Sequence, residues 1–379
     1  VAEIAAACVL LIGMTLCARS FDRARQVPLG LDPDKVLVAG YRIPPGVMSR
    51  EAAAGFYRRL KSDLEQIPGV ESVALADWLP LGFEGGSSST FTVPGYAAAP
   101  GEWIEADTAT VSPGYFQLLR TPMLRGRDFD DRDREGAPPV VIINEALARR
   151  YFPDREALGR QIEIWGHPRT IVGIVATGKY HDLNEAPRPF VWFPLEQITD
   201  YTLAAILRTT GSPESIRPAV ERVSVQIDPN ARPMACMSFK TYMAAVYLVP
   251  RTAAVLLAIL GGCAVFLAAL GIAGVISWSV NRRFREVGVR MALGAMPREV
   301  TWLFVRQALV LTAIGVVLGL VGGLLGGRGI AGLLVGVSPT DLPAFLIALP
   351  ALATVSALAA WLPARRAASI DPIVALRAE

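Results

Sequence analysis

The chain has 379 residues, of which 52% are hydrophobic, and a formal net charge of +3. This charge is too small to argue for nucleic-acid binding, and no run of basic residues interleaved with aromatic residues occurs. Two histidines and no cysteine pair at ligand spacing argue against a zinc site, so no cofactor is expected. Cys8, Cys17 and Cys263 lie in apolar segments, which leaves Cys236 without a partner for an internal disulfide.

The chain opens with an apolar run over residues 4–18. The length of this run alone suits a signal peptide, but Glu3 stands where such peptides carry Lys or Arg, and no clean cleavage pattern follows. Residues 1–20 are therefore interpreted as a transmembrane helix whose beginning is missing.

Residues 21–250 read as ordinary water-soluble sequence and contain two β-α-β patterns. In the first, predicted strands at 35–43 and 70–76 flank a helix that Ser49 opens. The apolar face of this helix comprises Phe56, Leu60, Leu64 and Ile67. In the second, strands at 202–207 and 233–237 flank a helix that starts at 212–213. These patterns predict a ferredoxin-like α+β part from about 21–80 and 200–250, with residues 81–199 inserted as a subdomain.

Within the insertion, strands are predicted at 139–143, 161–164 and 169–175, a short helix at 144–151, and a flexible loop at 85–89. Residues 173–179 match the glycine and lysine spacing of a phosphate-binding loop. However, Tyr180 takes the place of the Ser or Thr that binds magnesium, and prolines follow where a helix should start. An exposed turn is the better interpretation.

Three acidic residues, Asp130, Asp131 and Asp133, suggest a cation site. Arginines are interleaved with them, so a solvated turn is favoured instead. No serine lies in a nucleophile-elbow pattern, and no segment has the pattern of an active site. The chain is therefore not expected to be an enzyme.

Three long stretches carry no charge at all: residues 252–281, 307–327 and 342–364. A bilayer core of about 30 Å needs about 20 apolar helical residues to cross it. Because lipid offers backbone N–H and C=O groups no hydrogen-bond partners, such stretches span the membrane as helices. Buried helices of a large soluble protein are the disfavoured alternative. The predicted fold is an α-helical membrane protein of four spans, the first one truncated, with a large extracytoplasmic α+β domain. The later spans are placed at 251–281, 299–327 and 342–364.

As one helix, residues 252–281 would be about 45 Å long and would project beyond the membrane. Pro250 suits the first turn of this helix, and residues 239–248 are expected to continue it outward as a stalk.

Arginines set the expected orientation. Five of them lie in the connection 282–298 (Arg282, Arg283, Arg285, Arg290 and Arg298), and three follow the last span in the tail 365–379 (Arg365, Arg366 and Arg377). Positive charge in short loops favours the cytoplasm, so the connection and the tail are expected inside and the large domain outside. The reversed topology would expose all eight arginines outside.

Glycines recur every four residues in the third span, at Gly315, Gly319, Gly323 and Gly327. Such a stripe lets a neighbouring helix approach closely. Another span of this chain is the favoured partner, with a dimer mate as the alternative. A substrate conduit is disfavoured because no charge lies within these helices.

The connection 282–298 is predicted to form a short amphipathic helix. Glu286 and Arg290 are spaced to pair across one turn, and Phe284, Val287 and Met291 form a small apolar strip. Gly294 suits the end of this helix and Pro297 the start of the next. Both a docking role and a position on anionic lipid remain open.

Several motifs in the same order resemble the MacB and FtsX family of ABC-transporter permeases. The cytoplasmic segment RFREVGVRMALGA at 283–295 resembles the signature of that family, and LPARRAASIDPIVALR at 362–377 resembles its ending. In the soluble region VSPGYF at 111–116, LRGRDF at 124–129 and PVVIINEALARRYFP at 139–153 resemble the MacB-like extracytoplasmic domain. The resemblance covers nearly the whole chain.

The resemblance implies a bacterial inner-membrane protein on which a separate cytoplasmic ABC ATPase docks. The residues it assigns to ATPase coupling are Arg283, Glu286, Val287, Gly288, Arg290, Met291, Ala292, Leu293, Gly294 and Ala295. It also implies pairing with a second permease unit in the lipid bilayer, either as a homodimer or as the other half of a duplicated chain. Nucleotide-driven movement would pass through the long helices to the outer domain.

Two other functions are considered. One is an FtsX-like signalling subunit that activates an extracytoplasmic partner such as a cell-wall hydrolase. The other, a membrane-tethered hydrolase, is disfavoured because no nucleophile and base can be named.

Overall fold

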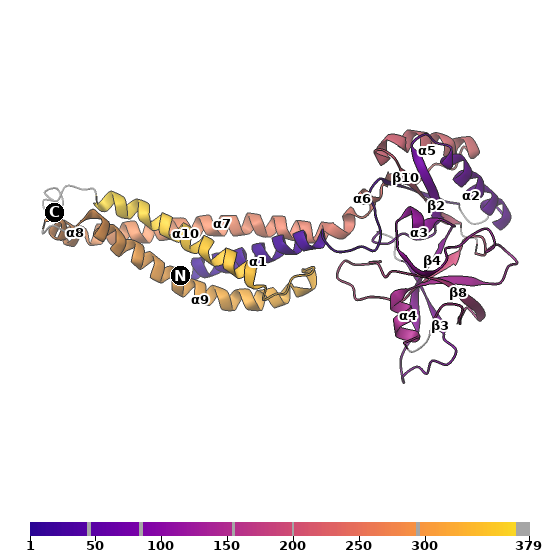
Figure 1. Ribbon diagram of the computed structural model, residues 1–379. Helices are drawn as coiled ribbons and strands as arrows, with labels where there is room; N and C mark the ends of the chain where they lie inside the picture. Colours follow the sequence, from indigo (N-terminus) through magenta and orange to yellow (C-terminus); the bar gives the residue numbers. More distant parts are fainter. Residues whose placement is uncertain (44–46, 83–85, 154–155, 199–200, 293–295, 369–379) are drawn as a thin grey trace. The chain divides into compact units, whose positions relative to one another are not determined.

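The computed structural model describes residues 1–43, 47–82, 86–153, 156–198, 201–292 and 296–368 (Figure 1). These residues form two compact units. We call Val1–Val27 with Tyr247–Glu379 the helical unit, and Pro28–Val246 the sheet unit. Each unit has its own hydrophobic core.

Four helices of the helical unit are long and apolar enough to cross a membrane, which confirms the predicted class of fold. The helices of this unit are α1 (Ala2–Ala24), α7 (Ala244–Arg282), α8 (Phe284–Ala292), α9 (Pro297–Gly329) and α10 (Leu342–Ala368), with a short 3-10 helix η1 (Ala331–Leu333). Pro297 is the first residue of α9, as predicted.

Helix α1 is the most buried of the four spans. In an apolar stretch of 18 residues in α1, 44% of the residues are buried within the chain, against 17% in the corresponding stretch of α7. Its side chains Ile4, Ile12 and Leu16 lie in a core shared with α7, α9 and α10. In Figure 1 this indigo helix runs alongside α9 and α10. It therefore fills the centre of the helical unit.

Polar contacts tie the end of α1 to the connection between α9 and α10. The Arg19 guanidinium lies 2.6 Å from an Asp341 carboxylate oxygen. The hydroxyl of the next residue, Ser20, accepts a hydrogen bond of 2.7 Å from the Val335 amide. The α9–α10 connection thus lies at the end of α1 from which the chain enters the sheet unit. Helix α8 joins α7 and α9 at their other ends.

Helix α7 departs from the sequence prediction at its start. Pro250 lies inside this 39-residue helix rather than in its first turn. Residues 239–248 do not form one stalk, because the short helix α6 (Phe239–Tyr242) ends at Met243 before α7 begins. A proline removes only one backbone donor, so the apolar residues on both sides can still continue the helix. As expected, α7 is nevertheless longer than a bilayer core requires, since it has 39 residues.

The sheet unit contains the predicted β-α-β pairs. The strands β11 (Ala235–Ser238), β1 (Val36–Arg42), β10 (Thr202–Thr209) and β2 (Val70–Ala76) lie side by side in that order, as in a ferredoxin-like sheet. Helices α2 (Arg50–Glu65) and α5 (Pro213–Ile227) pack over this part of the sheet with Tyr57, Leu60 and Val220 in the core. The Ser49 hydroxyl caps α2 by accepting from the Ala52 amide, as its position predicted.

The remaining strands close a ring of pairings. They are β3 (Ser87–Thr92), β4 (Glu105–Val111), β5 (Met123–Gly126), β6 (Val140–Asn144), β7 (Gln161–Ile164), β8 (His167–Val175) and β9 (Phe190–Pro194). From β4 the path runs through β3, β7, β8, β6 and β9 and returns to β4, while β5 pairs with β8. Phe91, Ile143 and Phe193 lie in the core that these strands surround. A single pairing, Ala76 with Val111, joins the ring to the ferredoxin-like strands.

Two short helices, α3 (Tyr115–Leu118) and α4 (Glu145–Tyr151), complete the sheet unit. The Asn144 side chain caps α4, in agreement with the predicted helix at 144–151. The expected flexible loop at 85–89 is wrong for Ser87–Ser89, which pair with β4 as part of β3. Serine and threonine tolerate an exposed strand edge, so loop-like composition misled the prediction there.

Candidate functional site

The helix predicted between the first two long spans is present as α8. Its Glu286 and Arg290 side chains form the expected ion pair, with 2.8 Å between the Arg290 nitrogen and the Glu286 oxygen. About half of each side chain is exposed. A pair this exposed adds only a few tenths of a kcal/mol to the helix, so it does not by itself fix the position of α8.

Apolar packing holds α8 against α9. Val287 is buried in the core of the helical unit and Met291 packs against that core. On α9 the side chains of Val300 and Phe304 are buried in the same core. The space left between the two helices is only about 10 Å³, too small for a ligand. One side of α8 is therefore buried against α9 of the same chain.

The opposite side of α8 remains open and includes a residue that the sequence reasoning did not select. Val289 is an exposed large hydrophobic residue, although it lies next to the Glu286–Arg290 pair. The signal in the sequence was a valine on the polar side of an amphipathic helix. Val289 therefore shows that the described part of the chain leaves this side of α8 uncovered.

The structure brings only some of the predicted coupling residues together. Arg283, Glu286, Val287 and Arg290 line the α8–α9 contact. Gly288 and Ala292 belong to α8, as Phe284 does, but the surroundings of these three residues are outside what the structure describes. Leu293, Gly294 and Ala295 lie entirely outside the described residues.

The glycine stripe of α9 lies against α1 of the same chain. A Cβ atom at Gly319 would be 2.4 Å from Cys8 Cβ, and one at Gly323 would be 2.9 Å from Ile12 Cδ1. Gly315 faces Ile4 in the same way, and a Cβ at Gly327 would meet the Pro339 carbonyl oxygen at 3.2 Å. The absence of side chains along this stripe is what lets α1 pack so closely.

Helix α1 carries an acidic side chain, Glu3, that the expectation of charge-free helices did not cover. Glu3 of α1 points toward α7, where a Cβ at Gly271 would be 2.5 Å from the Glu3 carboxylate. Glu3 is exposed on the helical unit. The sequence reasoning weighed only the three long charge-free stretches and so passed over a carboxylate in α1.

Tryptophans mark one end of the helical unit. Trp278 near the end of α7, Trp302 near the start of α9 and Trp361 near the end of α10 are all exposed. The Arg282 guanidinium lies 5.3 Å from the Trp278 ring, and that of Arg365 lies 5.1 Å from the Trp361 ring. Tryptophan beside arginine is typical of a membrane–water interface, and the arginines favour the cytoplasmic side.

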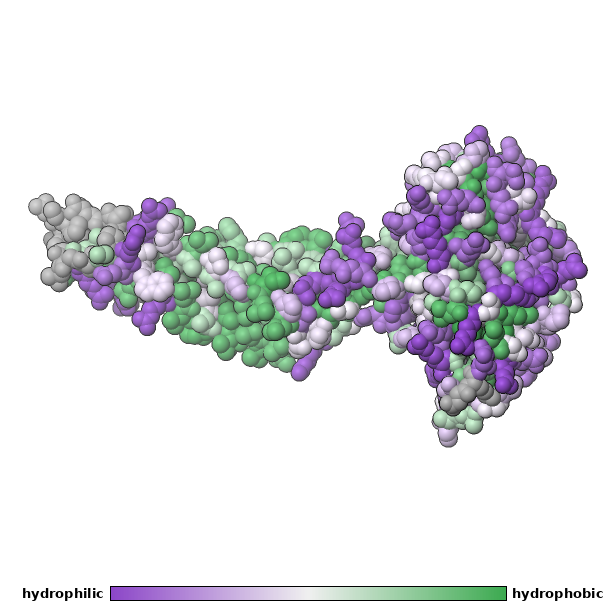
Figure 2. All heavy atoms as spheres, viewed as in Figure 1, coloured by the Kyte–Doolittle hydropathy of each residue, from purple (hydrophilic) through white to green (hydrophobic). Residues whose placement is uncertain are grey.

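Between this end and the α9–α10 connection, hydrophobic residues cover the outside of the helices (Figure 2). The exposed hydrophobic residues of α7 include Leu260, Phe266 and Leu270, and those of α9 include Val317 and Leu325. Such a surface is stable only against lipid or another apolar protein surface.

The segment that resembles a phosphate-binding loop is a packed turn. Residues 176–189 contain no helix. Gly178 lies against Leu29, whose carbonyl oxygen accepts a hydrogen bond of 3.0 Å from the Lys179 amide. The Lys179 ammonium is occupied by the Glu185 carbonyl oxygen. No helix follows this segment to hold a phosphate. The predicted exposed turn is nevertheless wrong, because residues 173–175 are the buried end of β8 and residues 176–179 are only partly exposed.

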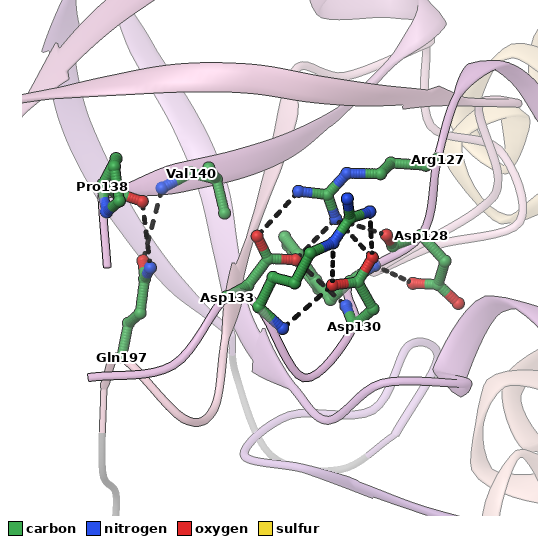
Figure 3. A network of polar contacts seen from close by, with 9 residues as sticks. Arg127, Asp128, Asp130, Asp133, Pro138, Val140 and Gln197 are labelled. Carbon is green, nitrogen blue, oxygen red and sulfur yellow. Dashed lines mark hydrogen bonds and ion pairs between the residues drawn. The ribbon is translucent and has the colours of Figure 1, made fainter. Parts of the chain in front are cut away.

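The acidic cluster is an ion-pair network (Figure 3). The Arg127 guanidinium donates to both carboxylate oxygens of Asp133, at 2.6 and 2.8 Å, and to Asp130 at 3.2 Å. Asp133 is buried, so the predicted solvated turn is wrong for this residue. The paired arginine makes that burial possible. Among the described residues, no group of three His, Cys, Asp or Glu side chains could hold a metal ion.

Two family models match the chain. The MacB-like periplasmic core domain matches residues 4–236, more than half of the chain, and the FtsX-like permease C-terminal model matches residues 258–372. The chain is an ABC transporter permease of the MacB and FtsX type. The resemblance seen in the sequence motifs is thereby confirmed.

Several curated relatives of the chain are also named as permeases. The uncharacterized ABC transporter permease YvrN of Bacillus subtilis is 28% identical over 293 residues, which cover 71% of this chain and 69% of YvrN. The uncharacterized ABC transporter permease YknZ of the same organism is 26% identical over 298 residues, which cover 73% of this chain and 71% of YknZ. The probable export ATP-binding/permease protein MacB of Pseudomonas entomophila is 27% identical, covering 72% of this chain but 42% of MacB. The chain thus spans less than half of the matched MacB protein.

Solved structures also resemble the chain. The periplasmic region of MacB from Actinobacillus actinomycetemcomitans is matched with a TM-score of 0.40 and 13% identity, over 58% of this chain and 95% of that one. The extracellular domain of YknZ is matched with a TM-score of 0.34 and 14% identity, over 51% and 94%.

The family and the four apolar helices make this permease a multi-pass protein of the bacterial inner membrane. The match to the periplasmic core domain covers all of the sheet unit except residues 237–246, and the sheet unit is extracytoplasmic. Helix α8, at the end marked by tryptophan and arginine, is therefore cytoplasmic.

Proposed function

We propose that the permease works with a separate cytoplasmic ABC ATPase that docks on α8 and drives movement of the extracytoplasmic sheet unit. The work done there would be export or extraction rather than conduction through the bilayer. The open side of α8, with Val289 between Glu286 and Arg290, is the observation that carries this proposal.

The ATPase is proposed to lie outside the residues that the structure describes. The one segment with the spacing of a phosphate-binding loop is a packed turn in the sheet unit. The MacB relative is named as an ATP-binding/permease protein, and this chain matches only 42% of it. ATP hydrolysis would then be contributed outside the matched part.

Helix α7 supports the mechanical part of the proposal. It is continuous from Ala244, at the edge of the sheet unit, to Arg282, which directly precedes α8. Its 39 residues give a length of about 58 Å at 1.5 Å per residue, well beyond a bilayer core. A rigid helix of this length can transmit a displacement of α8 to the other side of the membrane.

A second permease unit is the proposed partner within the bilayer. Only 17% of the apolar window of α7 is buried within the chain. The exposed hydrophobic residues of α7 form a surface that lipid or the α7 helix of a second copy can contact.

Co-purification of the full chain with its cognate ATPase tests the docking site. Val289→Asp places a charge in the proposed interface and should weaken ATPase binding about tenfold or more, equivalent to about 1.4 kcal/mol. Val47→Asp is the matched control, since Val47 is equally an exposed valine but lies in the sheet unit. Equal ATPase binding by both variants would contradict docking on α8.

The charge pair is tested by exchange. Glu286→Arg alone should lower both ATPase binding and ATPase stimulation. The double variant Glu286→Arg with Arg290→Glu keeps an ion pair within α8 but reverses its direction. We expect binding to stay low in the double variant, because the exposed half of each side chain would present the opposite charge to the ATPase. Full recovery would mean that the pair only stabilises the helix.

The signalling alternative has a distinct outcome. A permease that retains ATPase coupling and activates an extracytoplasmic enzyme, with no measurable export or extraction, would replace the transport function with a regulatory one.

A further inference from the structure

A cleft of about 360 Å³ lies within the sheet unit, where the ferredoxin-like strands meet the ring of strands. Helix α2 forms one side of it, and residues 134–135 and 195–197 form the other. This volume is in the range of small-molecule binding sites. Neither the family match nor the proposed ATPase docking assigns a role to this cleft.

The floor of the cleft is apolar. Tyr57, Leu75 and Leu203 line it and are buried. The Tyr57 hydroxyl already donates to the Tyr201 carbonyl oxygen at 3.0 Å, so the Tyr57 ring offers the cleft mainly its apolar face. Leu195, partly buried, extends the same surface. An alkyl chain or a similar apolar body would bury hydrophobic surface here.

Four cations line the sides of the cleft. Arg50, Arg58 and Lys61 share one face of α2, and Arg134 lies on the opposing segment. None of these four side chains forms an ion pair with any residue in the described part of the chain. Arg58 and Lys61 also attract the Glu196 carboxylate, so a ligand in the cleft would share these two cations with it.

Three carboxylates, Glu51, Glu135 and Glu196, also line the cleft. Glu51 is exposed at the start of α2, and hydrogen bonds from its own backbone N–H and from Ser49 lower its pKa, so it stays negatively charged. The Oε2 atom of Glu196 is buried without a hydrogen-bond partner, and burial raises the pKa of this side chain. Glu135 is exposed like Glu51, so the four cations of the cleft exceed its three carboxylates by one.

The wall opposite α2 is held rigidly (Figure 3). The bidentate contact between Arg127 and Asp133 fixes the turn that leads directly into Arg134. The Gln197 side chain bridges the Pro138 carbonyl oxygen and the Val140 amide. These contacts keep the cleft formed without a ligand, which lowers the cost of binding.

We propose that this cleft binds an amphiphile whose apolar body lies on Tyr57, Leu75 and Leu203 and whose carboxylate or phosphate head group meets the cations of α2 and Arg134. The site would make the sheet unit a receptor for such molecules, independently of ATPase docking on α8.

Protection of a cysteine from alkylation tests the site in the full chain in lipid nanodiscs. Ala54→Cys places a thiol in the cleft, and Ala52→Cys places one on the exposed, opposite side of α2. Dodecanoate at ten times its Kd should slow alkylation of the residue-54 thiol about tenfold by mass action and leave the residue-52 thiol unaffected. Dodecyl phosphate should do the same if the head-group charge matters more than its shape.

Two controls decide between recognition and partitioning. Methyl dodecanoate has the same chain without the charge and should protect at least several-fold less. Arg58→Gln with Lys61→Gln should abolish protection, whereas Arg59→Gln, which removes an exposed arginine paired with Asp63 outside the cleft, should preserve it. Equal protection by the ester, equal protection at both cysteines, or no protection by either anion would overturn the proposal.

Discussion

At the scale of single residues, close packing of α1 depends on the missing side chains of α9. At Gly319 an added Cβ would lie 2.4 Å from Cys8 Cβ and 3.0 Å from the Ala5 carbonyl oxygen. Both atoms belong to a neighbouring helix and cannot rotate away. The sequence predicted this stripe from spacing alone, but only the fold shows that α1 is the helix against it.

Gly319→Ala is therefore expected to destabilise the helical unit by about 1–3 kcal/mol, because the added methyl group forces α1 and α9 apart. Gly326→Ala is the control, since a Cβ there meets no atom within 4 Å. Thermal unfolding of the purified permease, followed by fluorescence, measures both. Equal shifts for the two variants would contradict the packing described.

The thiol of Cys236 is expected to react slowly, because burial raises its pKa from the ordinary 9.0 to about 11. The folded chain holds this proton more tightly than the unfolded chain does. The contribution of the thiol to stability is thus complete below pH 9.0 and is lost as the pH rises toward about 11. The alkylation rate of Cys236 should keep rising through this interval. A plateau at 9.0, as expected for an exposed thiol placed at Ala52, would contradict the shift.

At the scale of elements, the sequence predicted helices better where local signals and tertiary packing agree. Ser49 opens α2 and Asn144 opens α4 because each side chain bonds an amide of its own first turn. Pro250 misled the prediction because the apolar residues before it keep α7 helical despite one missing donor. Asp133 misled it because an arginine six residues earlier allows its burial.

The tie between α1 and the α9–α10 connection gives a prediction at this scale. Asp341→Asn should lower the melting temperature, since Arg19 loses a partly buried partner 2.6 Å away. A double-mutant cycle with Arg19→Gln should give a coupling energy of about 1 kcal/mol, measured by thermal unfolding. A coupling near zero would mean that the pair does not hold the connection in place.

At the scale of the whole molecule, the order of spans, orientation and outer domain follow from charge and hydropathy, which act over whole segments. The cleft does not, because its lining comes from segments far apart in the chain, such as Arg58, Arg134 and Glu196. The open side of α8 could be predicted from the sequence only in part. Spacing predicted the Glu286–Arg290 pair, whereas the exposure of Val289 depends on how α8 packs against α9.

The central claim is that ATP used at α8 moves the outer unit through α7. Hydrogen exchange of residues 244–250, measured in the full complex with its ATPase before and after addition of ATP, tests this most directly. The proposal predicts an ATP-dependent change in exchange at these residues that Val289→Asp abolishes and Val47→Asp preserves. An ATP-dependent change that persists in Val289→Asp, or no change in the unaltered complex, would contradict it.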